Sequence, residues 1–384
     1  MSSSARIAVV GMSAAGPTCG ARDHALLLAE ALRGEQVECS LHWLGRDTEA
    51  LRAGRGEIHR WTRALEGELA RARPDGVLLH YSVFAFSHRG VPVHVAPTLA
   101  ALRRVGAPVV TVLHEFVYPW RHRGWRARVW ATTQRAVLVD VLRSSAAVVV
   151  TTDFRARWLA TRPWLPKRPA VLAPVFSNLP AARVASVLRG ASASGRSRPA
   201  VGLFGYSFQG AAVAQVIEAL ALARAGGLDV QLRLLGAPGR PSAVADAWLA
   251  QARAYGVERA LSFSGVLAAQ ELADALAACE LLLFVDGSGP SSRKGTLAAS
   301  LASGRPVVAI DGPRRWGELV EARAARVVAP TAQALADAIG ELLAQESLRE
   351  QLGARGEAFA REGMSVERAA RAVRGALAEV GAVA

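Results

Sequence analysis

The chain is poor in cysteine and lysine and has no long uncharged apolar run. Its three cysteines, Cys19, Cys39 and Cys279, are too few and too widely spaced for a disulfide framework or a cysteine-based metal site. A transmembrane helix needs an apolar run of about 18 residues or more, so none is expected. The N-terminal residues run into a strand-like segment without the pattern of a signal peptide. We expect a cytoplasmic protein, with the inner face of a membrane as the alternative location.

Basic residues are in excess, with 46 lysines and arginines against 32 acidic residues and a formal net charge of +14. Such a charge suits nucleic acid, anionic lipid or a phosphorylated small molecule. The arginines are spread along the whole chain, and zinc-finger spacing, basic-zipper heptads and an aromatic RNA-binding signature are all missing. We therefore expect no nucleic-acid partner.

Short apolar segments alternate with amphipathic helical stretches such as His24–Arg33. Single cores stop growing near roughly 250–300 residues, so a chain of 384 residues predicts two domains. The segments are rich in Val and Leu without polar alternation, which is typical of buried parallel strands. They are Ile7–Val10, Val77–Leu79, Val109–Leu113, Val148–Val150, Ala200–Phe204, Gln231–Leu235, Leu261–Phe263, Leu281–Val285, Pro306–Ile310 and Arg326–Val328. The pattern predicts an α/β protein with two Rossmann-like domains facing a central cleft.

Composition also suggests where the domains meet. A small, polar, proline-bounded stretch at residues 186–199 is predicted to be a linker. Residues 1–185 then form the first domain and residues 200–384 the second, which ends in charged helices over Ser347–Val380. The final helix could instead pack back on the first domain.

The segment Ser288–Thr296 carries the strongest local signal. It lies between an apolar strand and a short helix over Leu297–Ser303, and it contains Arg293 and Lys294. The N–H groups of a first helical turn and the positive end of the helix dipole favour an anion there. A guanidinium and an ammonium are the usual cations that hold a phosphate. The pattern favours phosphate binding, and the alternative is an ordinary exposed basic cap.

All eight histidines lie at or before His122. If histidine supplies acid–base chemistry, it comes from the first domain, whereas the phosphate loop belongs to the second. Ligands of doubly wound sheets bind outside the carboxyl ends of the strands. We therefore expect the chemistry to take place between the two domains.

Six segments, taken in their order and spacing, point to a known family. They are Gly16–Leu32, Val110–Glu115, Ala173–Asn178, Phe204–Gly210, Leu261–Gly265 and Ser291–Val308. Together they resemble a family 4 retaining glycosyltransferase with the GT-B fold. The resemblance covers nearly the whole chain, from the glycine-rich first loop and the active-site histidine segment to the donor loop and its helix.

The sequence departs from the family's pattern at four positions. The family usually carries two glutamates, eight positions apart, where this chain has Ser291 and Ala299. The arginine and lysine of the family's first donor-domain loop fall on Tyr206 and Gln209. We interpret the basic pair at residues 293–294 as compensation for the missing positive charge. The alternative is an inactive homologue.

The resemblance implies three groups of site residues. Catalysis is expected from His114, with Glu115 orienting or charging its ring. Donor binding is expected from Gly20, Gly205, Tyr206, Gln209, Val266, Leu267, Ser291, Ser292, Arg293, Lys294, Gly295 and Thr296. Acceptor binding is expected from Arg22, Asp23, His24, His80 and Tyr81. The plainer alternatives are a histidine satisfied in a loop, a tight turn at Gly20 and a helix cap at Asp23.

The resemblance implies transfer of a sugar from a nucleotide-diphosphate sugar to an acceptor hydroxyl, with retention. Polysaccharide, glycolipid and secondary-metabolite biosynthesis are the expected settings, with a carbohydrate, lipid-linked or small-molecule acceptor. Asp286 has no aspartate-x-aspartate partner, so no metal or other cofactor is expected. The alternative functions are a non-catalytic partner subunit and a sugar-nucleotide epimerase.

Residues 120–130 interleave three tryptophans with four arginines. Such a segment suits a peripheral membrane contact, because tryptophan and arginine both favour a bilayer interface. The alternative is a helix with a tryptophan core face and a solvated arginine face.

Overall fold

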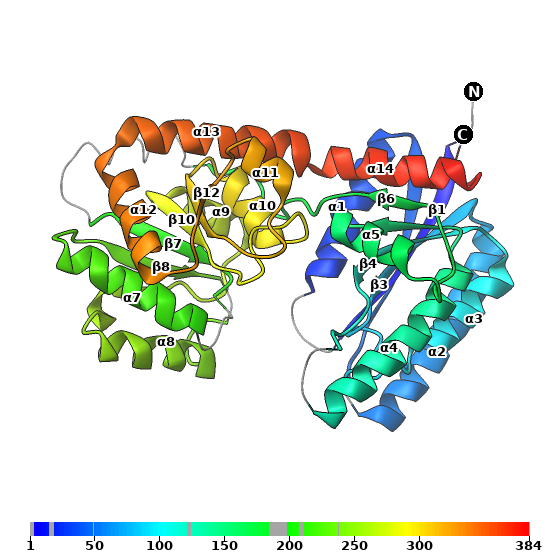
Figure 1. Ribbon diagram of the computed structural model, residues 1–384. Coiled ribbons are helices and arrows are strands. Elements are labelled where there is room, and N and C mark those ends of the chain that lie inside the picture. Colours follow the sequence, from blue (N-terminus) through cyan, green and yellow to red (C-terminus); the bar gives the residue numbers. More distant parts are fainter. Residues whose placement is uncertain are drawn as a thin grey trace. The chain divides into compact units, whose positions relative to one another are not determined.

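The computed structural model describes residues 4–14, 19–48, 50–120, 124–183, 198–206, 211–236 and 238–383 (Figure 1). The chain divides into two compact units, residues 1–174 with 366–384 and residues 175–365. Each unit is built on one six-stranded parallel sheet whose strands are connected through helices. The predicted fold class, an α/β protein with two Rossmann-like domains, is confirmed.

The sheet of the first unit has the strand order β2-β1-β3-β4-β5-β6, and every pair is parallel. The strands are β1 (Ala5–Ser13), β2 (Val37–Gly45), β3 (Gly76–Ser82), β4 (Val109–Glu115), β5 (Ala147–Val150) and β6 (Ala170–Leu172). The helices are α1 (Gly20–Gly34), α2 (Leu51–Ala72), α3 (Val95–Val105), α4 (Trp125–Ser144), α5 (Asp153–Thr161) and α14 (Val366–Glu379). The central strands are almost wholly buried, which explains their unbroken runs of Val and Leu.

The sheet of the second unit has the order β12-β11-β10-β7-β8-β9, again all parallel. The strands are β7 (Ala200–Phe204), β8 (Gln231–Leu235), β9 (Leu261–Phe263), β10 (Leu281–Phe284), β11 (Val307–Ile310) and β12 (Arg326–Val328). The helices are α7 (Ala211–Ala225), α8 (Ala243–Ala254), α9 (Ala269–Ala277), α10 (Gly295–Ala302), α11 (Gly317–Glu321), α12 (Ala332–Ala344) and α13 (Glu346–Gly363), with a 3₁₀ turn η2 at Glu258–Ala260. Within the described ranges, none of the helices of either unit has the length and apolar character needed to cross a membrane.

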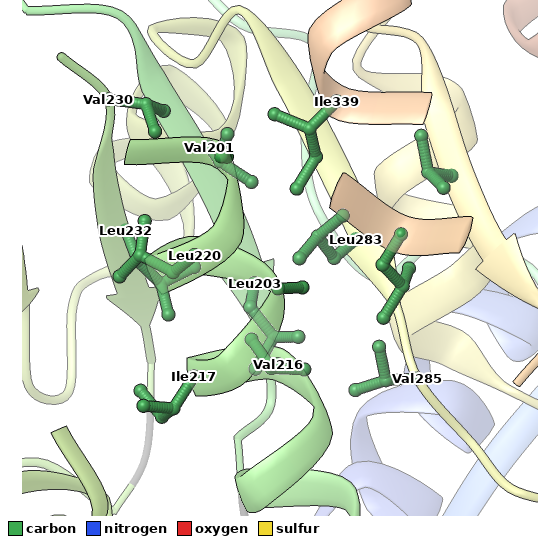
Figure 2. Close-up of a cluster of buried hydrophobic side chains, with 14 of the residues drawn as sticks. Val201, Leu203, Val216, Ile217, Leu220, Val230, Leu232, Leu283, Val285 and Ile339 are labelled. Atoms are coloured by element: carbon green, nitrogen blue, oxygen red, sulfur yellow. The ribbon is translucent and has the colours of Figure 1, made fainter. Parts of the chain in front are cut away.

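One face of the second sheet is covered by α7 and α12, which pack against each other. Figure 2 shows Leu203 of β7 and Leu283 of β10 among Val216 of α7 and Ile339 of α12. Burying such a side chain stabilises a fold by about 1.5–3 kcal/mol. This core holds the carboxyl ends of β7 and β10 in place.

All ten predicted strands are present, but two more were missed. β2 is an edge strand with partly exposed polar side chains at Cys39, Ser40 and His42, so it lacks the continuous apolar run of a buried strand. β6 has only three residues and also lies at an edge. Edge strands bury less surface, which weakens their signal in the sequence.

The observed division of the chain differs from the expected boundary at residue 185. Residues 175–183 belong to the second unit, because the Val175 N–H donates to the Ser292 carbonyl (2.8 Å) and the Arg183 N–H to Asp274 (2.7 Å). The predicted linker at residues 186–199 lies mostly outside the described residues, which resume at residue 198. α14 belongs to the first unit, where its buried face contacts α1, β5 and β6.

Candidate functional site

The second sheet changes direction between β7 and β10. From β7 the chain continues to β8 on one side, whereas from β10 it continues to β11 on the other. In open α/β sheets, ligands bind outside the carboxyl ends of the strands at such a switch point. Gly205 follows β7 there, and Asp286 begins the loop that follows β10.

The loop after β10 is held by its own hydrogen bonds. The Asp286 side chain accepts the Ser288 N–H (2.9 Å), and its carbonyl accepts the Gly289 N–H (2.8 Å). Gly289 has φ +85°, and a Cβ there would lie 2.9 Å from the backbone nitrogen of Gly312. The backbone segments can approach this closely because neither residue carries a side chain. These contacts hold the loop in one conformation and so fix the position of the residues that follow it, Ser291 to Lys294.

Lys294 forms an ion pair with Asp286, with 2.6 Å between Nζ and Oδ2. The side chain of Lys294 is 31% exposed and that of Asp286 12%. Burial alone would raise the pKa of Asp286, but the hydrogen bonds from Lys294 and Ser288 bring it below its ordinary value. The sequence predicted that Lys294 would offer its charge to phosphate; in this structure that charge already has a carboxylate partner.

α10 begins directly after Lys294 and packs against the loop that follows β7. Gly205 has φ +73°, and a Cβ there would lie 2.8 Å from Cγ2 of Thr296. The backbone at Gly205 therefore lies against the Thr296 side chain in the first turn of α10, with no room for a Cβ. The first N–H groups of α10 have no intrahelical acceptor, and the helix dipole adds positive potential. Donor residues predicted from two distant loops thus lie side by side.

The residues just before α10 in the chain include Ser291, Ser292 and Arg293. The two serines are buried. Ala299 is buried in the apolar core around α10, so neither position of the customary glutamates carries a carboxylate. Arg293 is partly exposed. The predicted compensation by the basic pair stays a prediction. It did not take into account that Lys294 is already paired with Asp286.

The remaining predicted donor residues have different surroundings. Tyr206 is fully buried, its Oη accepts the Gly239 N–H (2.6 Å), and its ring contacts Trp248 edge to face. This placement differs from the expected ligand contact, because the phenol is used inside the core. Val266 is 69% exposed beyond β9, and Leu267 is partly buried against the core around α10. Gln209 lies outside the described residues.

The first sheet has its own switch point, between β1 and β3, and three histidines gather there. His80 is in β3, His114 in β4, and His24 in the first turns of α1, the helix that follows β1. The register between β3 and β4 slips by one residue after Tyr81, which leaves His114 as the extra residue of a bulge. Nδ1 of His80 and Nε2 of His114 share a hydrogen bond at 3.0 Å, in which either nitrogen can be the donor. The ring of His24 meets both others edge to face, with centroids 5.8 and 5.1 Å away.

These three rings are neutral at neutral pH. Burial lowers the pKa of His24 and of His80 well below the ordinary histidine value, and the neighbouring His114 lowers both further. Burial also lowers the pKa of His114 to about 4, with the positive charge of Arg155 as a second cause. A neutral imidazole can accept a hydrogen bond or ligate a metal, but it cannot donate a proton as a general acid.

The other predicted residues of the first unit are either exposed or buried in the core. Arg22 and Asp23 are exposed on α1, and Glu115 is exposed at the end of β4. Gly20 begins α1 with open space where a Cβ would be, so no close backbone approach requires a glycine there. Tyr81 is fully buried against Phe86, which differs from the expected acceptor contact.

The tryptophan- and arginine-rich segment falls partly outside the described residues, which omit 121–123. Trp120 and Trp125 are 53% and 71% exposed, whereas Trp130 packs against Tyr118. Arg135 lies over the Trp120 ring, 4.6 Å from its centroid. The segment therefore combines one inward tryptophan with two outward ones, and membrane contact stays a prediction.

Two features of the site escaped the sequence analysis. Arg155 of α5 donates to the carbonyl of His114 and to Thr151 (3.0 Å), which fixes the end of β4; nothing in its local sequence singles it out. The histidine cluster, by contrast, had a signal. His80 and His114 each follow an apolar strand segment directly, and the carboxyl ends of neighbouring parallel strands meet at one edge.

Residues 199–345 match the family model described as Glycosyl transferases group 1. No curated protein matches the sequence. The structure of HepE from Anabaena with UDP and glucose is 17% identical over 98% of this chain and 100% of its own, with a TM-score of 0.66.

A glycosyltransferase from Rickettsia africae is 12% identical over 98% of both chains, with a TM-score of 0.71. A proposed UDP-N-acetylglucosamine 2-epimerase from Listeria monocytogenes is 13% identical over 97% of this chain and 95% of its own, with a TM-score of 0.60. These likenesses establish a GT-B fold of two parallel-sheet α/β domains. Together with the matched domain, they support a glycosyltransferase.

Proposed function

We propose that the protein transfers a sugar from a nucleoside-diphosphate sugar to an acceptor hydroxyl, with retention at the anomeric carbon. The observation that carries this proposal is the match of residues 199–345 to the glycosyl transferases group 1 family. That range contains both loops of the β7/β10 switch point, from Gly205 to Thr296. A likeness to solved structures would support the fold without any particular chemistry, whereas the matched domain contains the loops where a ligand is expected.

The donor diphosphate is proposed to lie against the first turn of α10. Its charge suits the N–H groups and dipole of that turn, and Arg293 and Lys294 add two cations. Lys294 would exchange part of its contact with Asp286 for a phosphate oxygen. Uracil is the first base to test, because the Anabaena protein was solved with UDP. We expect the base to lie near Val266 and Leu267.

The proposed reaction forms a bond between the acceptor oxygen and the anomeric carbon as the bond to the diphosphate breaks. The acceptor attacks from the face that the diphosphate leaves, and its hydroxyl proton passes to the departing diphosphate. Negative charge therefore develops on the diphosphate, where fixed amides and cations stabilise it best. The first turn of α10 and the basic pair Arg293 and Lys294 are therefore expected to carry this stabilisation.

The acceptor is proposed to contact the first unit near the β1/β3 switch point. His114 is the partly exposed member of the histidine cluster, and its neutral ring can accept a hydrogen bond from a hydroxyl. Acceptors in polysaccharide, glycolipid or secondary-metabolite biosynthesis all carry such hydroxyls. A lipid-linked acceptor would also suit the exposed Trp120 and Trp125.

Nucleotide binding is the first test. The purified protein is screened by thermal shift against UDP, GDP, ADP, CMP and dTDP, because a ligand that binds only the folded state raises its stability. We expect one nucleotide to shift the wild type and to lose that shift in Lys294→Ala and Arg293→Ala. Lys167→Ala is the matched control, since Lys167 is the other lysine of the chain and lies in the first unit.

Product analysis then separates the candidate reactions. Release of nucleoside diphosphate that depends on an acceptor supports transfer, and the anomeric configuration of the product tests retention. Conversion of the sugar nucleotide without an acceptor would support an epimerase instead. A protein that binds none of the five nucleotides would support the non-catalytic partner subunit.

A further inference from the structure

We propose that His24, His80 and His114 form a binding site for one divalent transition-metal ion of the Zn²⁺ type. The site lies wholly within the first unit and shares His114 with the proposed acceptor contact, but the transfer reaction itself does not require a metal. Its test needs neither nucleotide nor sugar, so it can succeed or fail independently of the proposed function.

The topology of the sheet brings the three residues together from distant parts of the sequence. His80 pairs in register with Gly11 of β1, and the bulge after Tyr81 sets His114 beside it at the end of β4. α1 starts beyond the end of β1 and supplies His24 from its first turns. Three secondary-structure elements thus each contribute one imidazole to the switch point, and rigid elements position ligands better than loops do.

The distances are close to those that a metal needs. One ring nitrogen from each residue lies within 4.8 Å of the other two. Zn–N bonds of about 2.0–2.1 Å in a tetrahedron place two ligand nitrogens about 3.3 Å apart. His80 Nδ1 and His114 Nε2 share a hydrogen bond at 3.0 Å, within a few tenths of an ångström of that separation, and a metal ion between them would take the place of the shared proton. The third nitrogen needs an adjustment of about 1.5 Å at most, which a small rotation of a side chain supplies.

Burial of His80 argues that its ring is placed for a ligand. The residue is 1% exposed, and its Nε2 has no hydrogen-bond partner among the described residues. A buried polar atom without a partner costs about 1–3 kcal/mol. A histidine that served only as core filling would be better replaced by an apolar residue of similar size. An ion bound at Nδ1 would offset part of the cost of burying this polar ring, although it would not reach Nε2 on the other side of the imidazole.

The ligand set selects among ions. Imidazole nitrogens suit zinc, copper, nickel and iron, whereas magnesium and calcium need oxygen ligands, and the cluster contains no carboxylate. Three protein ligands leave one tetrahedral position for water or another oxygen ligand. Arg155 donates to the His114 carbonyl, and its positive charge weakens cation binding but favours an anionic fourth ligand.

The experiment measures metal binding directly. The protein is stripped with EDTA, dialysed, and titrated with Zn²⁺ in competition with a chromophoric chelator; a parallel titration records the visible absorption of bound Co²⁺. We expect one equivalent of Zn²⁺ per chain, a tetrahedral Co²⁺ spectrum and no competition from Mg²⁺. Loss of an outer-shell partner weakens metal affinity by roughly 10–100-fold, so His80→Gln and His114→Gln should weaken it by at least that factor.

His59→Gln is the matched control, because His59 is exposed on α2 and should leave zinc binding unchanged. Circular dichroism checks that each variant is folded. His114 is partly exposed, so its variant keeps the test informative if His80→Gln does not fold. The proposal is overturned if the wild type fails to compete for zinc, if folded His114→Gln keeps full affinity, or if His59→Gln loses as much as the cluster variants.

Discussion

Replacing Gly205 by alanine tests the contact between the two loops of the second switch point. At φ +73° an alanine costs about 1–2 kcal/mol, because its Cβ crowds the following carbonyl oxygen. The new methyl would also lie 2.8 Å from Cγ2 of Thr296, whereas carbon atoms pack at about 3.5–4.0 Å. Relieving that overlap moves Thr296 by about 0.7 Å or strains the loop by about 1–3 kcal/mol. We expect Gly205→Ala to lower the free energy of unfolding by about 2–5 kcal/mol in total.

A second glycine separates the two contributions. Gly256 has φ +67° with open space where a Cβ would be, so Gly256→Ala should show the backbone cost of about 1–2 kcal/mol alone. Thr296→Ser removes Cγ2 and with it the overlap. The double variant Gly205→Ala/Thr296→Ser should therefore recover most of the stability that the overlap removes. A double-mutant cycle that includes Thr296→Ser alone isolates this coupling.

Urea unfolding followed by circular dichroism gives the stabilities, and calorimetric titration with the nucleotide found in the screen gives the affinities. We expect Gly205→Ala to weaken nucleotide binding and Gly256→Ala to leave it unchanged, because only the first displaces the start of α10. Equal destabilisation by the two glycine variants, with no rescue by Thr296→Ser, would refute the close packing on which the proposed donor site depends.

Three further predictions concern individual side chains. Asp286→Asn should tighten nucleotide binding about fivefold by calorimetry, since it frees Lys294 and removes a competing negative charge worth about 1 kcal/mol; weaker binding would mean that Asp286 positions the ammonium. Tyr206→Phe should lower the free energy of unfolding by about 1–3 kcal/mol, because the Gly239 N–H loses its acceptor, and should leave nucleotide affinity unchanged; an affinity loss alone would return Tyr206 to the ligand site. In EDTA, the first unit should lose stability as the pH falls from about 7.5 to 5.5, because the folded pKa values of the three clustered histidines are lowered and the unfolded chain binds protons first. Each histidine contributes about 1.4 kcal/mol to the free energy of unfolding that is lost between these pH values. His80→Gln removes one of them, so the pH-dependent loss, measured by tryptophan fluorescence during urea unfolding, should be about 1.4 kcal/mol smaller than in the wild type.

The fluorescence readout is selective for the first unit, because only Trp248 and Trp316 of the nine tryptophans belong to the second. His59→Gln again serves as the control, since an exposed histidine should leave the pH dependence as in the wild type. A pH dependence that is identical in the wild type and His80→Gln would contradict the buried neutral state of the cluster.

Much of the fold could be read from the sequence because buried parallel strands carry an unmistakable pattern. Runs such as Val77–Leu79 and Leu281–Val285 have no polar face, and turn residues bound them. β2 was missed for the opposite reason. The sequence of an edge strand with solvent-exposed polar side chains resembles that of a loop. The end of the first unit was misplaced because residues 175–183 are held to the second unit by hydrogen bonds to distant residues, which no local pattern encodes.

The site was predicted less completely than the fold. The loop at residues 288–296 was recognised because its chemistry is local: glycine, serine and two cations before a helix. The role of Asp286 was not, because its pairing with Lys294 depends on how the loop folds back. Tyr206 was expected at the ligand from the resemblance alone, which carries no information on whether its side chain points into the core, where the structure places it.

The course of α14 has a consequence for how the chain is made. The buried face of this last helix, with Ala369, Val373 and Leu377, completes the core of the first unit. Ala382 lies so close to Gly76 that a Cβ added at Gly76 would be 2.6 Å from the Cβ of Ala382. During synthesis, all of residues 175–365 therefore leave the ribosome before the first unit can close. Domains generally fold as units, so the unit that comes second in the sequence is the first that can finish folding, and the histidine-bearing unit cannot close until α14 has been synthesised.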